Sequence, residues 1–368
     1  MGISCGIVGL PNVGKSTLFN ALTRASVPAA NYPFCTIDPN IGVVPVPDSR
    51  LDKLVELVPT QKIVPTVMEF VDIAGLVKGA SQGEGLGNQF LGHIAQVDAV
   101  AHVVRCFESE DVVHVNGSVD PARDIEIIHT ELALRDLSIV TNAMHRLEKQ
   151  AKSGDKKAVQ TLDVLRKILV PLDAGKPARS VAIALSPAEK ELIHSLNLLT
   201  SKPVMYVCNV AEDQAAGDGG SHVEVVRRIA KDEGAGVVTI SAAIESQIAI
   251  LETDEERVEY LSAVGLKEPG LNRVIRAGYD LLGLITFFTV GETEDRAWTV
   301  RRGAPAPEAA GKIHSDIERG FIRAEVIGYD DFLACRSEAA AREQGKLRLE
   351  GKEYLIRDGD IVHFRFSV

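Results

Sequence analysis

The sequence predicts an α/β protein with a mainly parallel sheet, a helical hairpin inserted into it, and a small α+β domain near the carboxyl end. Three observations support this fold class. Short β-type runs alternate with helical patterns, and a glycine-rich loop follows the first of these runs. The periodicity then changes between residues 122 and 200, and again after residue 272.

The β-type runs are short and apolar, and helical patterns separate them. They lie at Ile3–Val8, Thr66–Val71, Ala99–Cys106, Val204–Cys208 and Gly236–Ile240. This alternation is typical of a parallel sheet, in which ligands bind at the carboxyl ends of the strands.

Residues 9–17, Gly-Leu-Pro-Asn-Val-Gly-Lys-Ser-Thr, match the phosphate-binding pattern G-x-x-x-x-G-K-[ST] and lie between the first strand and a helical pattern. Backbone N–H groups of such a loop surround phosphate oxygens. We expect Lys15 to reach the β- and γ-phosphates and Ser16 to ligate Mg²⁺. The phosphate-binding residues predicted here are Asn12, Val13, Gly14, Lys15, Ser16 and Thr17.

Two further segments fit a nucleotide switch. Asp72 follows a predicted strand and begins the pattern Asp-x-x-Gly, which ends at Gly75. An Asp at this place can hold Mg²⁺ through a water molecule, and the Gly75 N–H can approach the γ-phosphate. Thr36, in the preceding loop, would complete the Mg²⁺ shell when a γ-phosphate is present.

The segment between residues 122 and 200 has the pattern of a helical hairpin. Two apolar stripes at helical spacing flank the polar turn Lys152–Asp155. They are Ile125, Ile128, Leu132 and Ile139, then Ala158, Leu162, Leu165 and Leu169. A third helix is expected to begin after Ser186 as N-cap, with Pro187 at its first position and Glu189 at its third.

After residue 272 the pattern predicts four strands and one helix, from Pro307 to Arg319. The strands are Leu284–Val290, Ala297–Val300, Ile322–Ile327 and Ile361–Phe366. We therefore expect a nucleotide-binding domain over 1–121 and 201–278, a coiled-coil-like helical domain over 122–200, and a C-terminal domain over 279–368.

The C-terminal domain carries 13 Lys and Arg against 16 Asp and Glu, so its overall charge does not identify an RNA-binding module. Five basic residues that are close in sequence could still line one face of the domain. That face would be either a solvated surface or an RNA contact. The five residues are Arg301, Arg302, Lys312, Arg319 and Arg323.

The bulk composition is that of a globular protein of two or three domains, with 368 residues, 45 % hydrophobic and 25 % charged. A formal net charge of −11 argues against coating of nucleic acid or an anionic membrane. The five cysteines lack metal-ligand spacing, and no apolar stretch approaches the roughly 20 residues that cross a bilayer. We expect a cytoplasmic protein without a membrane partner.

Together these residues resemble the GTPase superfamily, and more closely the YchF-type, Obg-like ribosome-binding ATPases of its Obg-related branch. The segments at 33–40, 79–87 and 103–107 carry this resemblance beyond the generic motifs. The resemblance runs from the first strand to the last. It implies a G-type nucleotide-binding domain, a C-terminal domain of the β-grasp, TGS-like type, ATP as substrate with Mg²⁺, and the ribosome as partner.

The base-recognition segment departs from the Asn-Lys-x-Asp of ordinary GTPases, because residues 209–212 read Asn-Val-Ala-Glu. Glu212 is one methylene longer than the aspartate that binds guanine, and a carboxylate would be repelled by the N1 acceptor of adenine. An adenine pocket would use Asn209 on N6 and N7, with Val210 beside it and Glu212 turned away. Ser241 and Ala242 match the loop that closes over the base.

The sequence also departs from ordinary GTPases at a catalytic position. Leu76 follows Asp-x-x-Gly, where many GTPases have a Gln that orients water. His114, in the polar loop Glu108–Asn116, matches a histidine that the family is thought to use on water. Gln82 and Glu84 are alternatives. Asn12 either helps to hold K⁺ against the phosphates or simply bonds within its loop.

The predicted function is therefore a Mg²⁺-dependent ATPase and nucleotide switch that binds the ribosome, with RNA contact through the C-terminal and helical domains left open. Two alternatives remain: a GTP-selective GTPase, and a nucleotide-gated adaptor without turnover. A small-molecule kinase is disfavoured, because it leaves the segments at Asp72 and Asn209 without a role.

Overall fold

The computed structural model describes residues 3–24, 40–73, 86–109, 112, 114–115, 117–182 and 184–367. Two compact units make up the chain: Met1–Val44 with Glu69–Gly278, and Pro45–Met68 with Tyr279–Val368. The second unit includes residues 45–68, which the sequence patterns did not assign to it. Of the helices in the described ranges, none is long and apolar enough to span a membrane.

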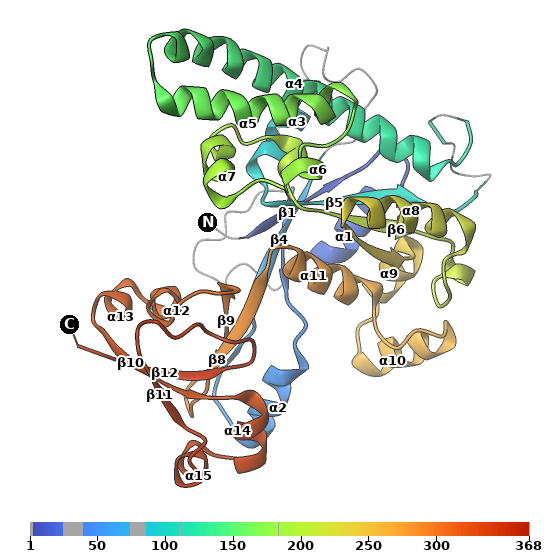
Figure 1. Cartoon of the computed structure of the whole chain (residues 1–368). Coiled ribbons are helices and arrows are strands. Elements are labelled where there is room, and N and C mark those ends of the chain that lie inside the picture. Colours follow the sequence, from blue (N-terminus) through green and yellow to red (C-terminus); the bar gives the residue numbers. More distant parts are fainter. Residues whose placement is uncertain are drawn as a thin grey trace. The chain divides into compact units, whose positions relative to one another are not determined.

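The first unit is built on a six-stranded sheet in the order β2-β4-β1-β5-β6-β7 (Figure 1). The strands are β1 (Ser4–Val8), β2 (Ile41–Pro45), β4 (Val67–Asp72), β5 (Ala99–Arg105), β6 (Val204–Asn209) and β7 (Gly236–Ile240). β1 runs parallel to β4 and β5, and β6 runs parallel to β5 and β7. The predicted parallel sheet is confirmed; the edge strand β2 was missed.

Helices follow the strands of this sheet in the manner of an α/β fold. They are α1 (Lys15–Arg24), α3 (Leu86–Gln96), α4 (Pro121–Lys152), α8 (Gly220–Glu233), α9 (Ala242–Ile248), α10 (Asp254–Ala263) and α11 (Gly270–Leu281), with the 3₁₀ turn η3 (Glu212–Gln214). Every residue of β1, β5 and β6 is buried, as expected for parallel strands covered on both faces.

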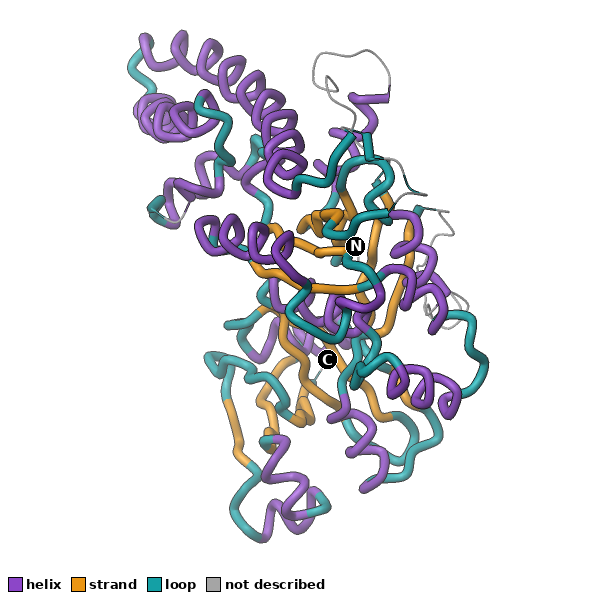
Figure 2. The backbone as a smooth tube through the Cα atoms, turned by 90° about the vertical axis from the view of Figure 1, so that its right-hand side faces the viewer, coloured by secondary structure: helices purple, strands orange, loops and turns teal. Residues whose placement is uncertain are grey.

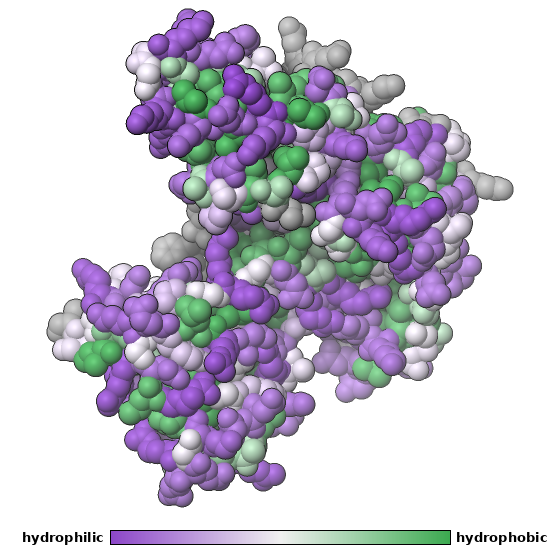
Figure 3. Space-filling model, viewed as in Figure 1, coloured by the Kyte–Doolittle hydropathy of each residue, from purple (hydrophilic) through white to green (hydrophobic). Residues whose placement is uncertain are grey.

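The predicted hairpin is confirmed. α4 and α5 (Lys156–Asp173) run side by side, and α6 (Arg179–Ala182), α7 (Pro187–His194) and the 3₁₀ turn η2 (Leu199–Ser201) follow (Figure 1). Ser186 and Glu189 form the capping box at the start of α7. On the face seen in Figure 3, hydrophilic side chains predominate over the hairpin, with smaller hydrophobic patches between them.

A buried carboxylate fastens α4 to the segment that leads back to the sheet. Asp136 accepts hydrogen bonds from the N–H groups of Leu199 (2.8 Å) and Thr200 (2.7 Å). The Thr200 hydroxyl donates a third bond to it, at 2.6 Å. The side chains of α4 and α5 enclose this anchor together with an apolar cluster that includes Val140, Leu165 and Ile168.

The second unit has a mixed six-stranded sheet in the order β11-β10-β12-β8-β9-β3, drawn as orange strands among its purple helices in Figure 2. Its strands are β3 (Ile63–Val64), β8 (Leu284–Thr289), β9 (Asp295–Arg301), β10 (Phe321–Ile327), β11 (Arg348–Glu350) and β12 (Ile361–Phe366). Its helices are α2 (Ser49–Leu57), α12 (Ala306–Ile313), α13 (Ser315–Arg319), α14 (Tyr329–Cys335) and α15 (Glu338–Glu343). Its α+β character is confirmed.

The single helix predicted from Pro307 to Arg319 is wrong. His314 lies between α12 and α13 in an extended conformation (φ −162°, ψ 143°), which ends the first helix. The His314 Nδ1 accepts a hydrogen bond from the Asp316 N–H at 3.1 Å and so caps the second helix. Helical periodicity continues across this break, which explains the error.

We expect Asp136→Ala to lower the free energy of unfolding by about 3 kcal/mol, because it leaves three buried donors without an acceptor. Urea denaturation followed by circular dichroism measures the change. The matched control is Asp163→Ala on α5, which removes an exposed ion pair with Arg166 and should cost no more than about 0.5 kcal/mol. Equal losses in the two variants would contradict the anchoring role of Asp136.

Candidate nucleotide site

The phosphate loop lies between β1 and α1, as its sequence predicts. Gly14 has φ 97°, and a Cβ atom at this residue would lie 2.3 Å from the amide nitrogen of Asn209. Only glycine fits this position, for conformational and steric reasons together. Asn12, at φ 62°, adopts the left-handed conformation that Asn tolerates better than most residues. The main chain therefore turns tightly before the first helical residue.

Lys15, the first residue of α1, is buried beneath this loop, and its Nζ donates a hydrogen bond to the Leu10 carbonyl at 2.7 Å. Burial lowers the pKa of Lys15 to about 8, and the nearby charge of Asp72 opposes this shift. Ser16 and Thr17 follow at exposed positions in the first turn of α1. The loop thus presents a partly desolvated ammonium group and two accessible hydroxyl groups.

Asp72 ends β4, next to β1 in the sheet. Its Oδ1 is buried and has no hydrogen-bond partner among the described residues. Burial raises the pKa of this carboxyl group, while the Lys15 charge opposes the rise. An acidic oxygen without a protein donor suits an interaction with the water shell of a cation.

The donor set fits Mg²⁺ held together with a nucleotide. In the described part of the chain, no group of three His, Cys, Asp or Glu side chains is placed to hold a metal alone. Mg²⁺ commonly takes one or two protein oxygens and completes its shell with phosphate and water. Ser16 and Asp72 supply such oxygens. Thr36 and Gly75 lie outside the described residues, as do Leu76, Gln82 and Glu84.

Asn209 bridges the phosphate loop and the segment before α9. Its Nδ2 donates to the Val13 carbonyl and its Oδ1 accepts from the Ala242 N–H, both at 2.9 Å. The side chain is buried at the end of β6. This bridge was not predicted from the sequence, which assigned Asn209 only to the base.

The other residues predicted around the base have different environments. Val210 is buried in an apolar cluster, and its N–H donates to the Ile240 carbonyl at 2.8 Å. Ser241 is buried before α9, and its hydroxyl has no partner among the described residues. Glu212 is exposed at the start of η3. The structure thus brings Asn209, Ala242 and the phosphate loop together, with Glu212 on the surface.

His114 is buried rather than exposed on its loop. Its Nε2 lies 2.8 Å from Oδ2 of Asp124, and the two side chains are 4 % and 3 % exposed. Asp124 lies in the first turn of α4. Sequence analysis missed Asp124; its position shortly after the Asp120-Pro121 helix start, ten residues beyond His114, was the available signal.

Arg105, at the end of β5, is a second buried residue that was given no role from the sequence. It is 1 % exposed, and its Nη1 has no hydrogen-bond partner among the described residues. Its Nε donates to the Phe107 carbonyl at 3.1 Å, and the guanidinium carbon lies 4.5 Å from the centre of the Phe107 ring. Burial lowers its pKa, against the attraction of Glu108 and Asp124.

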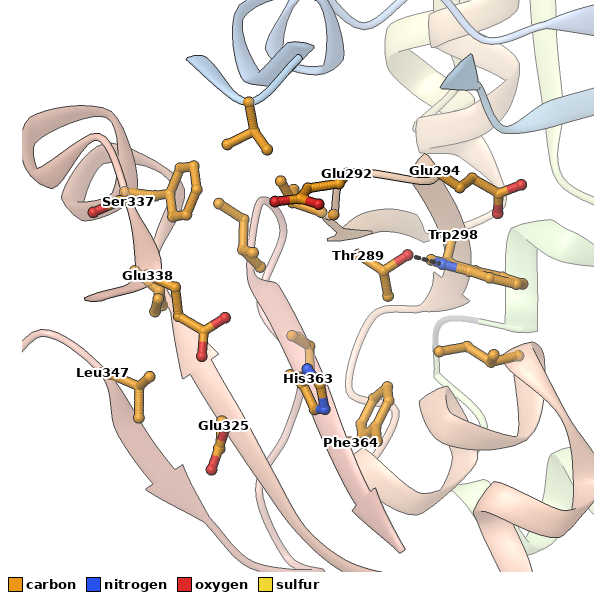
Figure 4. Close-up of a pocket in the computed structure, with 18 of the residues that line it drawn as sticks. Thr289, Glu292, Glu294, Trp298, Glu325, Ser337, Glu338, Leu347, His363 and Phe364 are labelled. Carbon is orange, nitrogen blue, oxygen red and sulfur yellow. Dashed lines mark hydrogen bonds between the residues drawn. The ribbon is translucent and has the colours of Figure 1, made fainter. Parts of the chain in front are cut away.

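The second unit contains a pocket of about 560 Å³ along its sheet. Figure 4 shows the carboxylates of Glu292, Glu294, Glu325 and Glu338 around it, and the hydrogen bond from Trp298 Nε1 to Thr289 Oγ1 at 2.9 Å. Four carboxylates make this pocket unsuited to phosphate.

The sheet order, the phosphate loop and the paired Lys15 and Asp72 define a P-loop nucleotide-binding protein of the GTPase class. A family model described as "50S ribosome-binding GTPase" matches residues 4–143, and the model "YchF-GTPase_C", described as a protein of unknown function, matches residues 284–367. The chain belongs to the YchF family, because relatives of that name are 60 % and 57 % identical to it over its full length.

Relatives support this membership over the full length. The chain is 60 % identical to a Haemophilus ducreyi protein and 57 % identical to an Escherichia coli O157:H7 protein, with both chains fully covered. Each relative is named "Ribosome-binding ATPase YchF". The solved YchF GTPase of Schizosaccharomyces pombe is 38 % identical, with a TM-score of 0.87 over 99 % of this chain and 98 % of that chain.

We expect nucleotide affinity to fall as pH rises above about 8. The predicted phosphate ligand is the protonated form of Lys15, which predominates below its lowered pKa. The affinity is therefore fully present at pH 7 and declines by up to about tenfold per pH unit above 8. Titration of a fluorescent nucleotide at saturating Mg²⁺ from pH 7 to 9.5 measures it. Lys15→Met should bind weakly with a flat profile; a flat wild-type profile would contradict the assignment.

Proposed function

We propose that this chain is a Mg²⁺-dependent ATPase that acts as a nucleotide switch and binds the ribosome. The observation that carries the nucleotide part is the presence of two opposite charges near the phosphate loop, the buried Lys15 and the half-buried Asp72. Burial lowers the pKa of Lys15 and raises the pKa of Asp72, so it favours the uncharged form of each side chain. A bound phosphate and cation would compensate both charges, which is typical of a ligand site.

The proposed reaction is in-line attack of water on the γ-phosphate. Backbone N–H groups of residues 12–17 and the Lys15 ammonium bind the phosphates. Ser16 and Thr36 would hold Mg²⁺ directly and Asp72 through water, and the bound ion would supply charge compensation; the Gly75 N–H would bind the γ-phosphate. His114 orients or activates the water. A role for Asn12 in holding K⁺ stays a prediction.

The preference for ATP rests on the base side of the site. Asn209 already fixes the loop through both ends of its amide, so its remaining N–H and lone pair are held in one orientation, which an adenine base would have to match. Glu212 is exposed and longer than the aspartate that pairs with guanine. These features favour adenine, with Val210, Ser241 and Ala242 forming the surrounding wall.

The test is competition of ATP against GTP for a fluorescent nucleotide, with turnover of each measured in parallel. We expect a preference for ATP of at least tenfold, about 1.4 kcal/mol. Glu212→Asp should reduce the preference for ATP over GTP, because it should improve GTP binding. Asn209→Ala should weaken both nucleotides, because it also releases the phosphate loop. Gln214→Ala, in the same 3₁₀ turn, is the control.

A clear GTP preference in the wild-type chain would replace the ATPase with a GTP-selective GTPase on the same fold. Tight binding of either nucleotide without turnover, including in the presence of ribosomes, would favour the non-hydrolysing adaptor.

The ribosome is proposed as the partner because the full-length relatives are named ribosome-binding proteins. The hairpin and the C-terminal unit are the proposed contact surfaces. All five cations singled out in the C-terminal sequence are exposed, whereas the acidic pocket of the same unit is unsuited to RNA. Direct RNA contact would therefore use the cations and avoid the pocket.

We expect Arg301→Ala with Arg302→Ala to weaken ribosome binding and to make its salt dependence shallower by about two phosphate contacts. Co-sedimentation with ribosomes at several salt concentrations measures both. Arg227→Ala on α8, which removes a different exposed arginine, is the matched control. Unchanged slopes would assign the contact to ribosomal protein instead of RNA.

A further inference from the structure

We propose that the second unit binds an extended, basic segment of a partner protein as an added strand along β12. The backbone of the segment would pair with β12, and its side chains would fill the pocket of about 560 Å³ beside that strand. The nucleotide site takes no part in this binding, so the proposed ATPase function and this binding can each fail without the other.

One side of β12 is largely unpaired. On its other side, β12 pairs with β10 from Ile361 to Phe366. Toward β8, however, Ile361 lies opposite Phe288, and no later residue of β12 has a strand partner among the residues that the structure describes. β8 ends at Thr289, whereas β12 continues to Phe366. The β8 side of β12, from His363 to Phe366, is therefore an open edge.

The ladder pattern shows which backbone groups this open edge offers. The Phe288 N–H donates to the Asp360 carbonyl at 2.8 Å, so Asp360 directs its carbonyl group toward β8. Residues along a strand direct their backbone groups alternately to one side and the other. The N–H and C=O groups of Phe364 and Phe366 consequently face the open edge. An added strand would supply the hydrogen-bond partners that this pattern lacks.

The pocket runs along the open edge and has room for a short strand. Val362, His363 and Phe364 of β12 line it, as do Thr289 and the turn that follows β8. From His363 to Phe366 the edge measures about 14 Å at the usual rise per residue, which suits an added strand of about four residues. A segment that enters this pocket is therefore placed directly beside β12.

The two faces of an added strand would meet different surroundings. Phe364 belongs to an apolar cluster against which Trp298 and Ile317 pack, and both of these side chains line the pocket. The next residue back, His363, belongs to the opposite face of the sheet and lies beside Glu325 of β10. Figure 4 shows Phe364 and Glu325 to either side of His363. Alternate side chains of the segment would therefore be apolar and polar.

Charge indicates that the polar side chains of the segment are basic. Among the described residues that line the pocket, four are glutamates and none is Lys or Arg. Neighbouring cations lie 3.0 to 3.6 Å from three of these glutamates: Arg365 and Arg342 at Glu325, Arg342 at Glu338, and Lys62 and Arg296 at Glu294. Glu292 is exposed and has no ion-pair partner in the described part of the chain. A lysine or arginine of the segment would pair with Glu292.

Trp298, the single tryptophan of the chain, makes occupancy of the pocket measurable. Its Nε1 donates to Thr289 Oγ1 at 2.9 Å, which holds the ring in one orientation. The full chain is titrated with a capped peptide of alternating lysine and valine, and with a matched peptide of alternating glutamate and valine. We expect a saturable change in Trp298 emission, with affinity for the lysine peptide about tenfold higher than for the glutamate peptide.

A matched pair of variants tests the charge. Glu292→Gln removes the carboxylate without an ion-pair partner and should weaken binding of the lysine peptide about threefold or more, with a smaller effect at high salt. Glu353→Gln, at an exposed position outside the pocket, should leave the affinity unchanged. Equal effects of the two variants would contradict a basic segment at Glu292.

A pair of modified peptides tests the strand pairing and leaves the protein unaltered. One lysine peptide is N-methylated at its lysines and the other at its valines. Because alternate N–H groups of a strand face the same side, only one of the two sets would donate to β12. One modified peptide should therefore lose binding while the other keeps it. Loss in both, or in neither, would overturn pairing with the open edge.

The remaining outcomes identify other occupants of the edge. An unchanged Trp298 emission up to about 1 mM lysine peptide, the limit of weak binding, would overturn the proposal. Equal affinity for the lysine and glutamate peptides would overturn a basic partner segment. A chain that sediments as a dimer and dissociates as the lysine peptide binds would assign the open edge to a second copy of this chain instead.

Discussion

The amide of Asn209 is the interaction on which the nucleotide site depends. It connects three segments that are far apart in sequence: the phosphate loop at Val13, the end of β6, and the start of α9 at Ala242. Its Nδ2 occupies the space that a Cβ on Gly14 would need. The shape of the phosphate loop and the position of the base segment are therefore set by one another.

In the absence of a ligand, the charged forms of Lys15 and Asp72 are disfavoured by their partial removal from water. Lys15 and Asp72 are both desolvated by the fold, and each provides only part of the compensation that water would give the other. The Leu10 carbonyl accepts a hydrogen bond from one of the three N–H groups of the Lys15 ammonium. The free energy stored in these groups favours an anionic ligand that brings a cation with it, as a Mg²⁺-nucleotide does.

Much of the fold follows from local sequence patterns. The five predicted strands of the first unit end within one residue of the observed ones, because buried parallel strands are continuous apolar runs. The edge strand β2 was missed in the first unit, and β3 and α2 were missed in the second, since residues 45–68 belong to one compact unit with residues 279–368. β3 has only two residues and pairs with β9, more than 230 positions away. Such pairing leaves no local signal.

The sequence predicted which residues form the candidate site, but it did not predict the hydrogen bonds between them. The phosphate loop and Asp72 are encoded in contiguous motifs, and the structure places them on neighbouring strands as expected. The partners of Asn209 depend on how segments far apart in the sequence meet, and no spacing rule predicts this. His114 was expected on a polar loop, because the loop sequence gives no sign of the helix turn that covers the ring.

Helix α4 takes part in several of the buried polar contacts of the first unit. Its first turn contacts His114 through Asp124, and further along it His129 meets Tyr206 of β6 (OH to Nε2, 3.1 Å). Glu233 of α8 accepts from Tyr206 at 2.9 Å and from Arg179 of α6 at 2.6 Å. Burial lowers the pKa of His129 to about 4, so the ring is neutral near pH 7 and serves this cluster through hydrogen bonds.

One continuous helix thus contacts the sheet at β6 and the candidate catalytic histidine, and also forms one arm of the hairpin. Asp136 fastens the same helix to the segment before β6, so the base of the hairpin is tied to the sheet at two levels. The first turn of the same helix contacts His114 through Asp124.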